Sequence, residues 1–316
     1  MTTDDRDTPL VDEGASAPFS KGLMAQTLMS TGLAPELAYN VAAAVERRLR
    51  RRGPAALTLG DLREIALEQL GPAAGDVLME RFRQWQKLRR LETPLIVLIG
   101  GATGVGKSTL ATQLAHRLGI TRVISTDMVR QTMRAFFAPE LMPAIHTSSF
   151  DAASAVRVPV PRETDLSKMG FIEQTKAVSV GIEALIARGI DEAQRLVVEG
   201  VHVVPGYLDR SRWGEAIVLE FVLAIGDKDR HRGNFTVREW ETGGIRPLRR
   251  YIEHFSDIRR IQKYIVGRAQ ALGAPVIDGP SLDANLNEVL GMILRRVEEE
   301  GADSDAGPPP LWDPRA

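Results

Sequence analysis

Residues 95–108 read LIVLIGGATGVGKS, and this stretch decides the fold of the 316-residue chain. Its first five residues form a continuous apolar run, which is typical of a strand buried on both faces of a parallel sheet. The last eight fit the pattern Gly-x-x-x-x-Gly-Lys-Ser, and residues 109–115 continue with helical character. A strand, a glycine-rich loop and a helix in this order are the context in which that pattern forms a phosphate-binding P-loop.

The predicted loop carries the chemistry that holds a triphosphate such as ATP. Glycines let the backbone curl around phosphate oxygens, and the amide groups at the start of the helix supply positive potential. Lys107 would reach the terminal phosphates as a catalytic residue, and Ser108 would bind Mg²⁺. A glycine-rich turn that binds nothing is the alternative, and the flanking strand and helix disfavour it. The predicted ATP-binding residues are Gly101, Ala102, Thr103, Gly104, Val105, Gly106, Lys107, Ser108 and Thr109.

Beyond the loop, apolar segments alternate with helical stretches. The later strands are predicted at residues 122–125, 196–199, 217–223 and 274–277. Strands that alternate with helices indicate an α/β fold, here a P-loop NTPase-type doubly wound, mainly parallel sheet. Residues 139–168 have no clear periodicity, so we expect a loop-rich insertion near the active site.

The chain before Pro94 has a different character, because its apolar residues recur at helical spacing from Phe19 to about Arg90. Gly32 and the pair Gly53-Pro54 are breaks between the expected helices. This pattern predicts a small, mostly helical domain. One of its apolar faces is formed by Ala38, Val41, Ala42, Val45 and Leu49.

Four segments follow from these patterns. The ends are predicted to be disordered, because the first is acidic and polar and the last holds three consecutive prolines among Asp, Ser and Gly. The expected boundaries are 1–9 for the first end, 10–92 for the helical domain, 93–299 for the P-loop domain and 300–316 for the tail.

Composition narrows the class of protein further. Lys plus Arg number 40 against 41 Asp plus Glu, a formal net charge of -1, so no overall field attracts nucleic acid or an anionic membrane. The absence of Cys excludes disulfides and thiolate metal sites and fits a reducing compartment. The start of the chain does not resemble a signal peptide, and no apolar run could span a bilayer. We therefore expect a cytoplasmic protein with a small-molecule partner, and its oligomeric state stays open.

Transfer of a phosphoryl group to a hydroxyl needs a base near the acceptor. Asp127 follows the strand at 122–125, at the end of the sheet where ligands collect, and is the candidate base. Alternatively it is only the N-cap of a helix at 128–137. Arg130 and Arg134 share its helical face and could clamp an anionic acceptor, or could be a solvated surface.

A second carboxylate, Glu199, ends another apolar strand at 196–199. An acid at this position can hold Mg²⁺ together with Ser108, although a capping or ion-paired role is the alternative. His202 follows shortly and could contact substrate, whereas a lone His is more often a structural residue.

Cationic residues are dense after the strand at 217–223, from Asp227 to Arg250. Such a segment suits a lid that closes over the transferred phosphate, and a basic helical surface is the alternative. The segment continues into apolar residues at helical spacing, more typical of core than of ligand contacts. The arginines are Arg230, Arg232, Arg238, Arg246, Arg249 and Arg250.

Taken in order, these motifs resemble the 2-phosphoglycerate kinase family, an ATP-cone module followed by a P-loop kinase domain. The resemblance covers about residues 10–298. It rests on strings spread over the whole chain: Pro18-Phe19-Ser20-Lys21-Gly22, Thr31-Gly32-Leu33, Ile99 to Ser108, Val123-Ile124-Ser125-Thr126-Asp127, Glu199-Gly200-Val201-His202 and Tyr251-Ile252-Glu253-His254-Phe255. Where an arginine is expected just before an aromatic residue after His231, this chain has Asn234-Phe235.

The resemblance implies phosphorylation of the 3-hydroxyl of 2-phosphoglycerate by Mg-ATP, giving 2,3-diphosphoglycerate. It also implies that the front module binds a regulatory nucleotide, with Lys21 in contact with its phosphates. Two other functions stay open. One is a P-loop kinase acting on another small hydroxy or phosphorylated metabolite. The other is a non-enzymatic ATP sensor, which would bind ATP without transfer.

Overall fold

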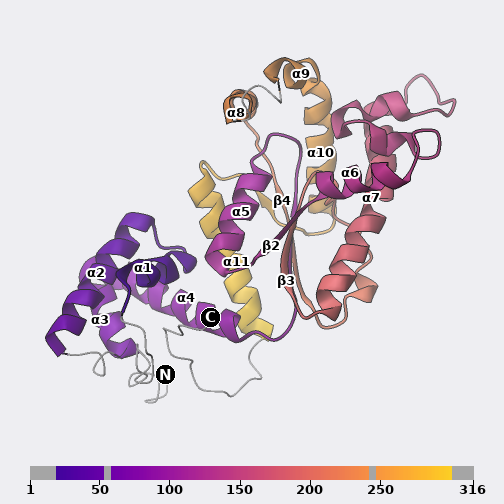
Figure 1. Cartoon of the computed structure of the whole chain (residues 1–316). Helices are drawn as coiled ribbons and strands as arrows, with labels where there is room; N and C mark the ends of the chain where they lie inside the picture. Colours follow the sequence, from indigo (N-terminus) through magenta and orange to yellow (C-terminus); the bar gives the residue numbers. More distant parts are fainter. Residues whose placement is uncertain (1–18, 53–57, 242–246, 301–316) are drawn as a thin grey trace. The chain divides into compact units, whose positions relative to one another are not determined.

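The computed structural model describes residues 19–52, 58–241 and 247–300 (Figure 1). They form two compact units, one made of Glu92–Asn285 and the other of Met1–Leu91 together with Leu286–Ala316. The predicted disorder at 1–9, and at 300–316 apart from the first residue, lies outside the described residues, as does Arg246 of the predicted lid.

A five-stranded sheet in the order β2-β3-β1-β4-β5 forms the centre of the Glu92–Asn285 unit. All of its strand pairs are parallel, which confirms the predicted α/β class. Glu199 pairs with both Ile99 and Ser125 in the register, so β1, β2 and β3 end at the same edge. The strands are β1 (Leu95–Gly100), β2 (Arg122–Ser125), β3 (Arg195–Glu199), β4 (Ile217–Leu223) and β5 (Val276–Ile277).

Helices cover both faces of this sheet, as Figure 1 shows for α5 and α7. Ile96 and Leu98 of β1 belong to one buried cluster with Val178, Ile182 and Ile186 of α7. Every residue of β1 is buried, as expected for a strand covered on both sides. The helices are α5 (Lys107–Leu118), α6 (Thr126–Phe136), α7 (Leu166–Asp191), α8 (Lys228–Glu241), α9 (Leu248–Glu253) and α10 (Phe255–Ala271).

The segment predicted to be loop-rich, residues 139–168, contains two short 3-10 helices, η3 (Pro143–His146) and η4 (Ser149–Ala155). A third, η5 (Arg210–Arg212), precedes β4. Both η3 and η4 contact α7, and η3 also contacts α6. The segment is therefore packed onto the helices beside the sheet edge where the P-loop lies.

Two boundaries differ from the sequence prediction by two residues. Helix α6 begins at Thr126 rather than at residue 128, because the Ser125 hydroxyl accepts a hydrogen bond from the Asp127 amide and so caps the helix. The reading of Asp127 as the N-cap is therefore wrong. The last strand, β5, begins at Val276 rather than at residue 274, and Pro275 before it has no amide hydrogen to donate to the sheet.

The other unit is helical in its described parts. Its helices are α1 (Lys21–Ser30), α2 (Pro35–Arg52), α3 (Leu59–Leu70), α4 (Pro72–Arg90) and the part of α11 (Leu282–Glu300) from Leu286 onward. The predicted apolar face of α2 is buried, and a reciprocal capping box between Thr58 and Asp61 starts α3. The amide of Gln84 on α4 donates to Glu298 of α11 at 2.6 Å. The P-loop domain predicted from the sequence, residues 93–299, includes this last helix except for Glu300.

None of the described helices is long and apolar enough to cross a membrane.

Candidate functional site

The P-loop connects β1 to α5 in a form that depends on glycine. Gly104 has φ of 86°, and a Cβ at this position would run into the ring of Phe235. Gly106, with φ of 89°, is the residue just before α5. The motif leaves position 104 open, but the left-handed conformation and the close approach of the Phe235 ring disfavour any side chain there in this chain.

Lys107 is the first residue of α5, and its ammonium group is buried. Its Nζ donates a hydrogen bond to the Ala102 carbonyl at 2.6 Å, inside the loop. Burial lowers the pKa of Lys107, while the nearby carboxylates of Glu199 and Asp127 act in the opposite direction. The positive charge of Lys107 is therefore only partly compensated by the protein, and the phosphates of an added triphosphate would compensate it further.

Ser108 and Glu199 join the P-loop helix to the end of β3 by a hydrogen bond. The hydroxyl of Ser108 donates to Glu199 Oε1 at 3.0 Å, and Glu199 is buried. Hydroxyl and carboxylate oxygens suit Mg²⁺, which usually takes one or two protein ligands and the phosphates of its nucleotide. No group of three or more His, Asp or Glu side chains among the described residues could hold a metal alone. The donor set fits a metal that is bound together with nucleotide.

Asp127 lies in the first turn of α6, and its side chain is 59% exposed. Arg130, one turn later, is buried and points its Nε toward Asp127 Oδ1 at 3.5 Å. The Nη1 group of Arg130 donates to the carbonyls of Ile145 and Thr147 at 2.9 and 2.8 Å. Arg130 therefore holds η3 in place beside Asp127, in addition to any contact with an acceptor.

Arg134 is exposed and donates to the neighbouring Gln131 side chain at 3.0 Å. A further cation comes from α9, where Arg250 donates to the Ser148 hydroxyl at 2.8 Å and lies over the Phe150 ring. Burial lowers the pKa of Arg130, and the nearby charges of Arg134 and Arg250 act in the same direction. Three guanidinium groups thus gather near Asp127. Of these, the sequence predicts Arg130 and Arg134 as acceptor contacts, and it places Arg250 only in the cationic lid segment.

Helix α8 contacts the P-loop directly. His231 Nε2 lies 2.8 Å from the Thr103 carbonyl, and Asn234 Nδ2 donates to the Gly104 carbonyl at 2.8 Å. Phe235 stacks on Tyr251 of α9 with ring centroids 4.8 Å apart. The pair Asn234-Phe235, where the family resemblance predicts an arginine and an aromatic residue, is therefore the part of α8 that packs on the loop.

His202 has no exposed surface, and both of its ring nitrogens bond to protein groups, Thr126 and Gln174. The reading of His202 as a substrate contact is therefore wrong. Burial is the reason, because the side chain lies between Thr126 of α6 and Gln174 of α7.

Lys21, the predicted regulatory contact, belongs to the helical unit. It is exposed and is the first residue of α1, which the hydroxyl of Ser20 caps.

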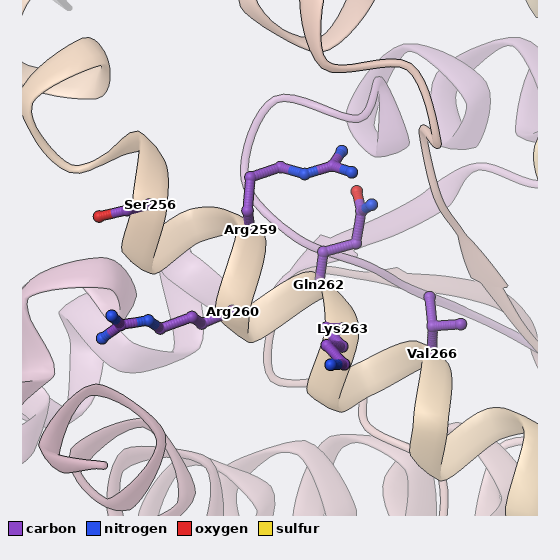
Figure 2. A pocket seen from close by; sticks show the side chains of 6 residues that line it. All are labelled: Ser256, Arg259, Arg260, Gln262, Lys263 and Val266. Atoms are coloured by element: carbon purple, nitrogen blue, oxygen red, sulfur yellow. The ribbon is translucent and has the colours of Figure 1, made fainter.

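A pocket lies along α10, and one of its lining residues, Arg259, approaches His231 with its Nη1 group 3.4 Å from His231 Nδ1 (Figure 2). Arg259 and Gln262 both donate to the Ile225 carbonyl, whereas Figure 2 shows Arg260 and Ser256 directed away from them. The side chains do not converge on one point, so we assign no ligand to this pocket. It is lined by Ser256, Arg259, Arg260, Gln262, Lys263 and Val266.

A parallel sheet with a P-loop after its central strand, and an acid at the end of the neighbouring strand, defines a P-loop NTPase-type domain. No family model matches the chain. The 2-phosphoglycerate kinase of Methanothermobacter thermautotrophicus is 38% identical over 284 residues, which cover 90% of this chain and 92% of that protein. Those of Methanopyrus kandleri and Thermococcus kodakarensis are 36% and 38% identical, over 89% and 90% of this chain and 85% and 95% of theirs. The chain belongs to the 2-phosphoglycerate kinase family.

Proposed function

We propose that this chain transfers the γ-phosphoryl group of ATP to the 3-hydroxyl of 2-phosphoglycerate. The observation that carries the proposal is that Lys107 of the P-loop lies within electrostatic range of a carboxylate in each of two halves of one site. The P-loop with the Ser108–Glu199 contact forms the donor half, and Asp127 with its neighbouring arginines forms the acceptor half. Lys107 is electrostatically linked to carboxylates of both halves, Glu199 and Asp127.

On the donor side, the P-loop amides and Lys107 bind the β- and γ-phosphates. Lys107 exchanges its bond to the Ala102 carbonyl for phosphate oxygens, and its charge stabilises the negative charge that spreads over the moving phosphoryl group. Ser108 and Glu199 would hold Mg²⁺, which supplies further charge neutralisation on the phosphates when bound.

On the acceptor side, Asp127 removes the proton from the 3-hydroxyl as its oxygen attacks the γ-phosphorus. The bond from that phosphorus to the bridging oxygen of ADP breaks, so the products are ADP and 2,3-diphosphoglycerate. The substrate carries a carboxylate and a phosphate, and guanidinium groups recognise both by paired hydrogen bonds. We assign that recognition to Arg130 and Arg134.

An acceptor screen tests the proposal. Purified chain with Mg-ATP is given 2-phosphoglycerate, 3-phosphoglycerate, glycerate and glycerol phosphate, and ADP release is measured. We expect the highest kcat/KM with 2-phosphoglycerate. A higher value with another acceptor would identify a different kinase, and ATP binding without any acceptor-dependent turnover would favour the ATP sensor.

The variant Lys107→Ala should lower kcat with the preferred acceptor by about 10²-fold or more, because the charge on the transferred group is left uncompensated. Lys176→Ala is the matched control, since Lys176 is exposed on α7. Equal kcat values in both variants would contradict the assigned role. The cytoplasmic location and the absence of nucleic-acid partners expected from the sequence stay predictions.

A further inference from the structure

The hydrogen bonds around His202 determine which ring nitrogen carries its proton. The Gln174 Nε2 group donates to the carbonyls of Ala144 and Thr147 at 2.5 and 3.1 Å, so its Oε1 must be the atom that faces the histidine. His202 Nε2 lies 2.9 Å from that oxygen and has to donate. In the neutral ring Nδ1 is then an acceptor, and Thr126 Oγ1 at 3.0 Å donates to it.

Burial keeps the ring in that form. His202, Thr126 and Gln174 each have no exposed surface. The loss of water around the ring lowers the pKa of His202 to about 4, so it is neutral near pH 7. Gly200, in the loop after β3, also lies close against Thr126, because a Cβ at Gly200 would run into the Thr126 side chain. Thr126 is thus held from two directions.

These hydrogen bonds, together with the ion pair between Arg130 and Asp127, close a ring around the acceptor half of the site. Starting at Asp127, the ring runs through the adjacent Thr126, across to His202 and on to Gln174 of α7. Gln174 and Arg130 both donate to the Thr147 carbonyl, and Arg130 returns to Asp127 with its Nε. The ring therefore connects the start of α6, the loop after β3, helix α7 and the end of η3.

We propose that His202 is a positioning residue, which fixes Asp127 and Arg130 relative to each other through Thr126, Gln174 and the Thr147 carbonyl. The inference rests on the proposed function, because Asp127 is the base and Arg130 the anion contact only in that reaction. His202 touches neither substrate. It acts by holding the first turn of α6 and the end of η3 at one separation, and an error of about 1 Å in such an arrangement can cost on the order of 10²-fold in rate.

The same substitution at two buried threonines gives a matched test. Thr126→Val removes the hydroxyl that donates to His202, whereas Thr175→Val removes a buried hydroxyl for which the described residues offer no hydrogen-bond partner. We expect Thr126→Val to lower kcat/KM for 2-phosphoglycerate by about 10-fold or more, with the KM for ATP unchanged. Thr126→Ser, which keeps the hydroxyl, should recover most of the loss. Thr175→Val should keep the wild-type values.

A histidine ring spectrum tests the geometry without reference to turnover. In the wild-type chain labelled with ¹⁵N-histidine, the His202 signal, assigned by its loss in His202→Gln, should show a protonated Nε2 and an unprotonated Nδ1. Thr126→Val should shift that signal, and Thr175→Val should not. A ring protonated at Nδ1, or exchanging between both forms, would overturn the proposal.

The two readouts separate this proposal from the function on which it depends. If the wild-type chain shows no turnover with 2-phosphoglycerate, the proposed function fails, and the ring spectrum still decides whether His202 is held as described. If the wild-type chain turns over and Thr126→Val matches Thr175→Val in both kcat and KM, the positioning role is wrong.

Discussion

At the scale of single residues, Ser125 and Asp127 at the end of β2 have separate roles, helix capping and the proposed catalysis, which the sequence alone did not assign to different residues. Ser125 caps α6, and Asp127 keeps an exposed carboxylate. Asp127→Asn should therefore lower kcat by about 10²-fold with little change in thermal stability, because the variant loses the base and keeps the cap.

The reverse outcome is expected for Ser125→Ala. Loss of the cap should cost about 1 kcal/mol of stability while the base remains in place. Thermal unfolding and steady-state kinetics of both variants check the division. If Asp127→Asn retains kcat and loses stability, Asp127 is not the base.

His202 makes stability depend on pH in one direction. The pKa of His202 in the folded chain, about 4, lies below the ordinary histidine value of 6.5, so between these values the unfolded chain binds a proton that the folded chain does not. The contribution of His202 to the free energy of unfolding is fully present above pH 6.5. It decreases by an amount on the order of 3 kcal/mol as the pH drops toward 4. Melting temperatures of the wild-type chain and His202→Gln, compared from pH 7.5 to 4.5, measure this term.

The wild-type melting temperature should fall more steeply below pH 6.5 than that of His202→Gln, in which residue 202 cannot be protonated. Parallel curves would show that His202 is protonated in the folded chain at the same pH as in the unfolded chain.

The residues that the sequence could predict at this scale are those with a local pattern. Lys107 and Ser108 sit in a motif whose spacing alone identifies the chemistry. His202 and Arg250 have no such spacing, because their partners lie 28 to 102 residues away in the chain and meet them only after folding.

At the scale of elements, α8 is both a candidate lid helix and a support for the P-loop. Asn234→Ala removes one of the bonds that hold the Gly104 carbonyl, so the loop should become less ordered before ATP binds. Loss of a hydrogen bond worth about 1 kcal/mol predicts a rise of roughly fivefold in the KM for ATP, with the KM for the acceptor unchanged.

Thr236→Ala, on the exposed side of the same helix, is the control for Asn234→Ala. Isothermal titration with a non-hydrolysable ATP analogue separates binding from turnover. Equal affinities in the two variants would mean that α8 does not support the loop.

The strands were predictable because four of the five are apolar runs or end in the polar residues that form the site. The start of α6 was not, since Ser, Thr and Asp at 125–127 are all good N-cap residues and only the three-dimensional hydrogen bond selects Ser125. The short helices η3 and η4 have no periodicity to read, and η3 is held by hydrogen bonds from the distant side chains of Arg130 and Gln174.

At the scale of the whole molecule, the division into two units could be read from the change of pattern near Pro94, but the assignment of the last helix could not. The sequence of an amphipathic helix at the end of a chain does not indicate which unit the helix packs against. Its buried residues, Val289, Leu290, Ile293, Leu294 and Val297, are equally suited to either core.

The helical unit provides the last prediction. If it holds a regulatory nucleotide, as the resemblance to an ATP-cone implies, Lys21 is the cation placed to meet its phosphates, exposed at the start of α1 where helix amides add positive potential. Lys21→Ala should then leave kcat at saturating ATP unchanged and abolish any change in rate caused by a second nucleotide added at constant Mg-ATP. Arg50→Ala, exposed on α2, removes a positive charge elsewhere in the unit and should preserve that response. A response that survives in Lys21→Ala would place the regulatory contact on other residues. A wild-type chain whose rate does not respond to any added nucleotide would show that this unit has a different task.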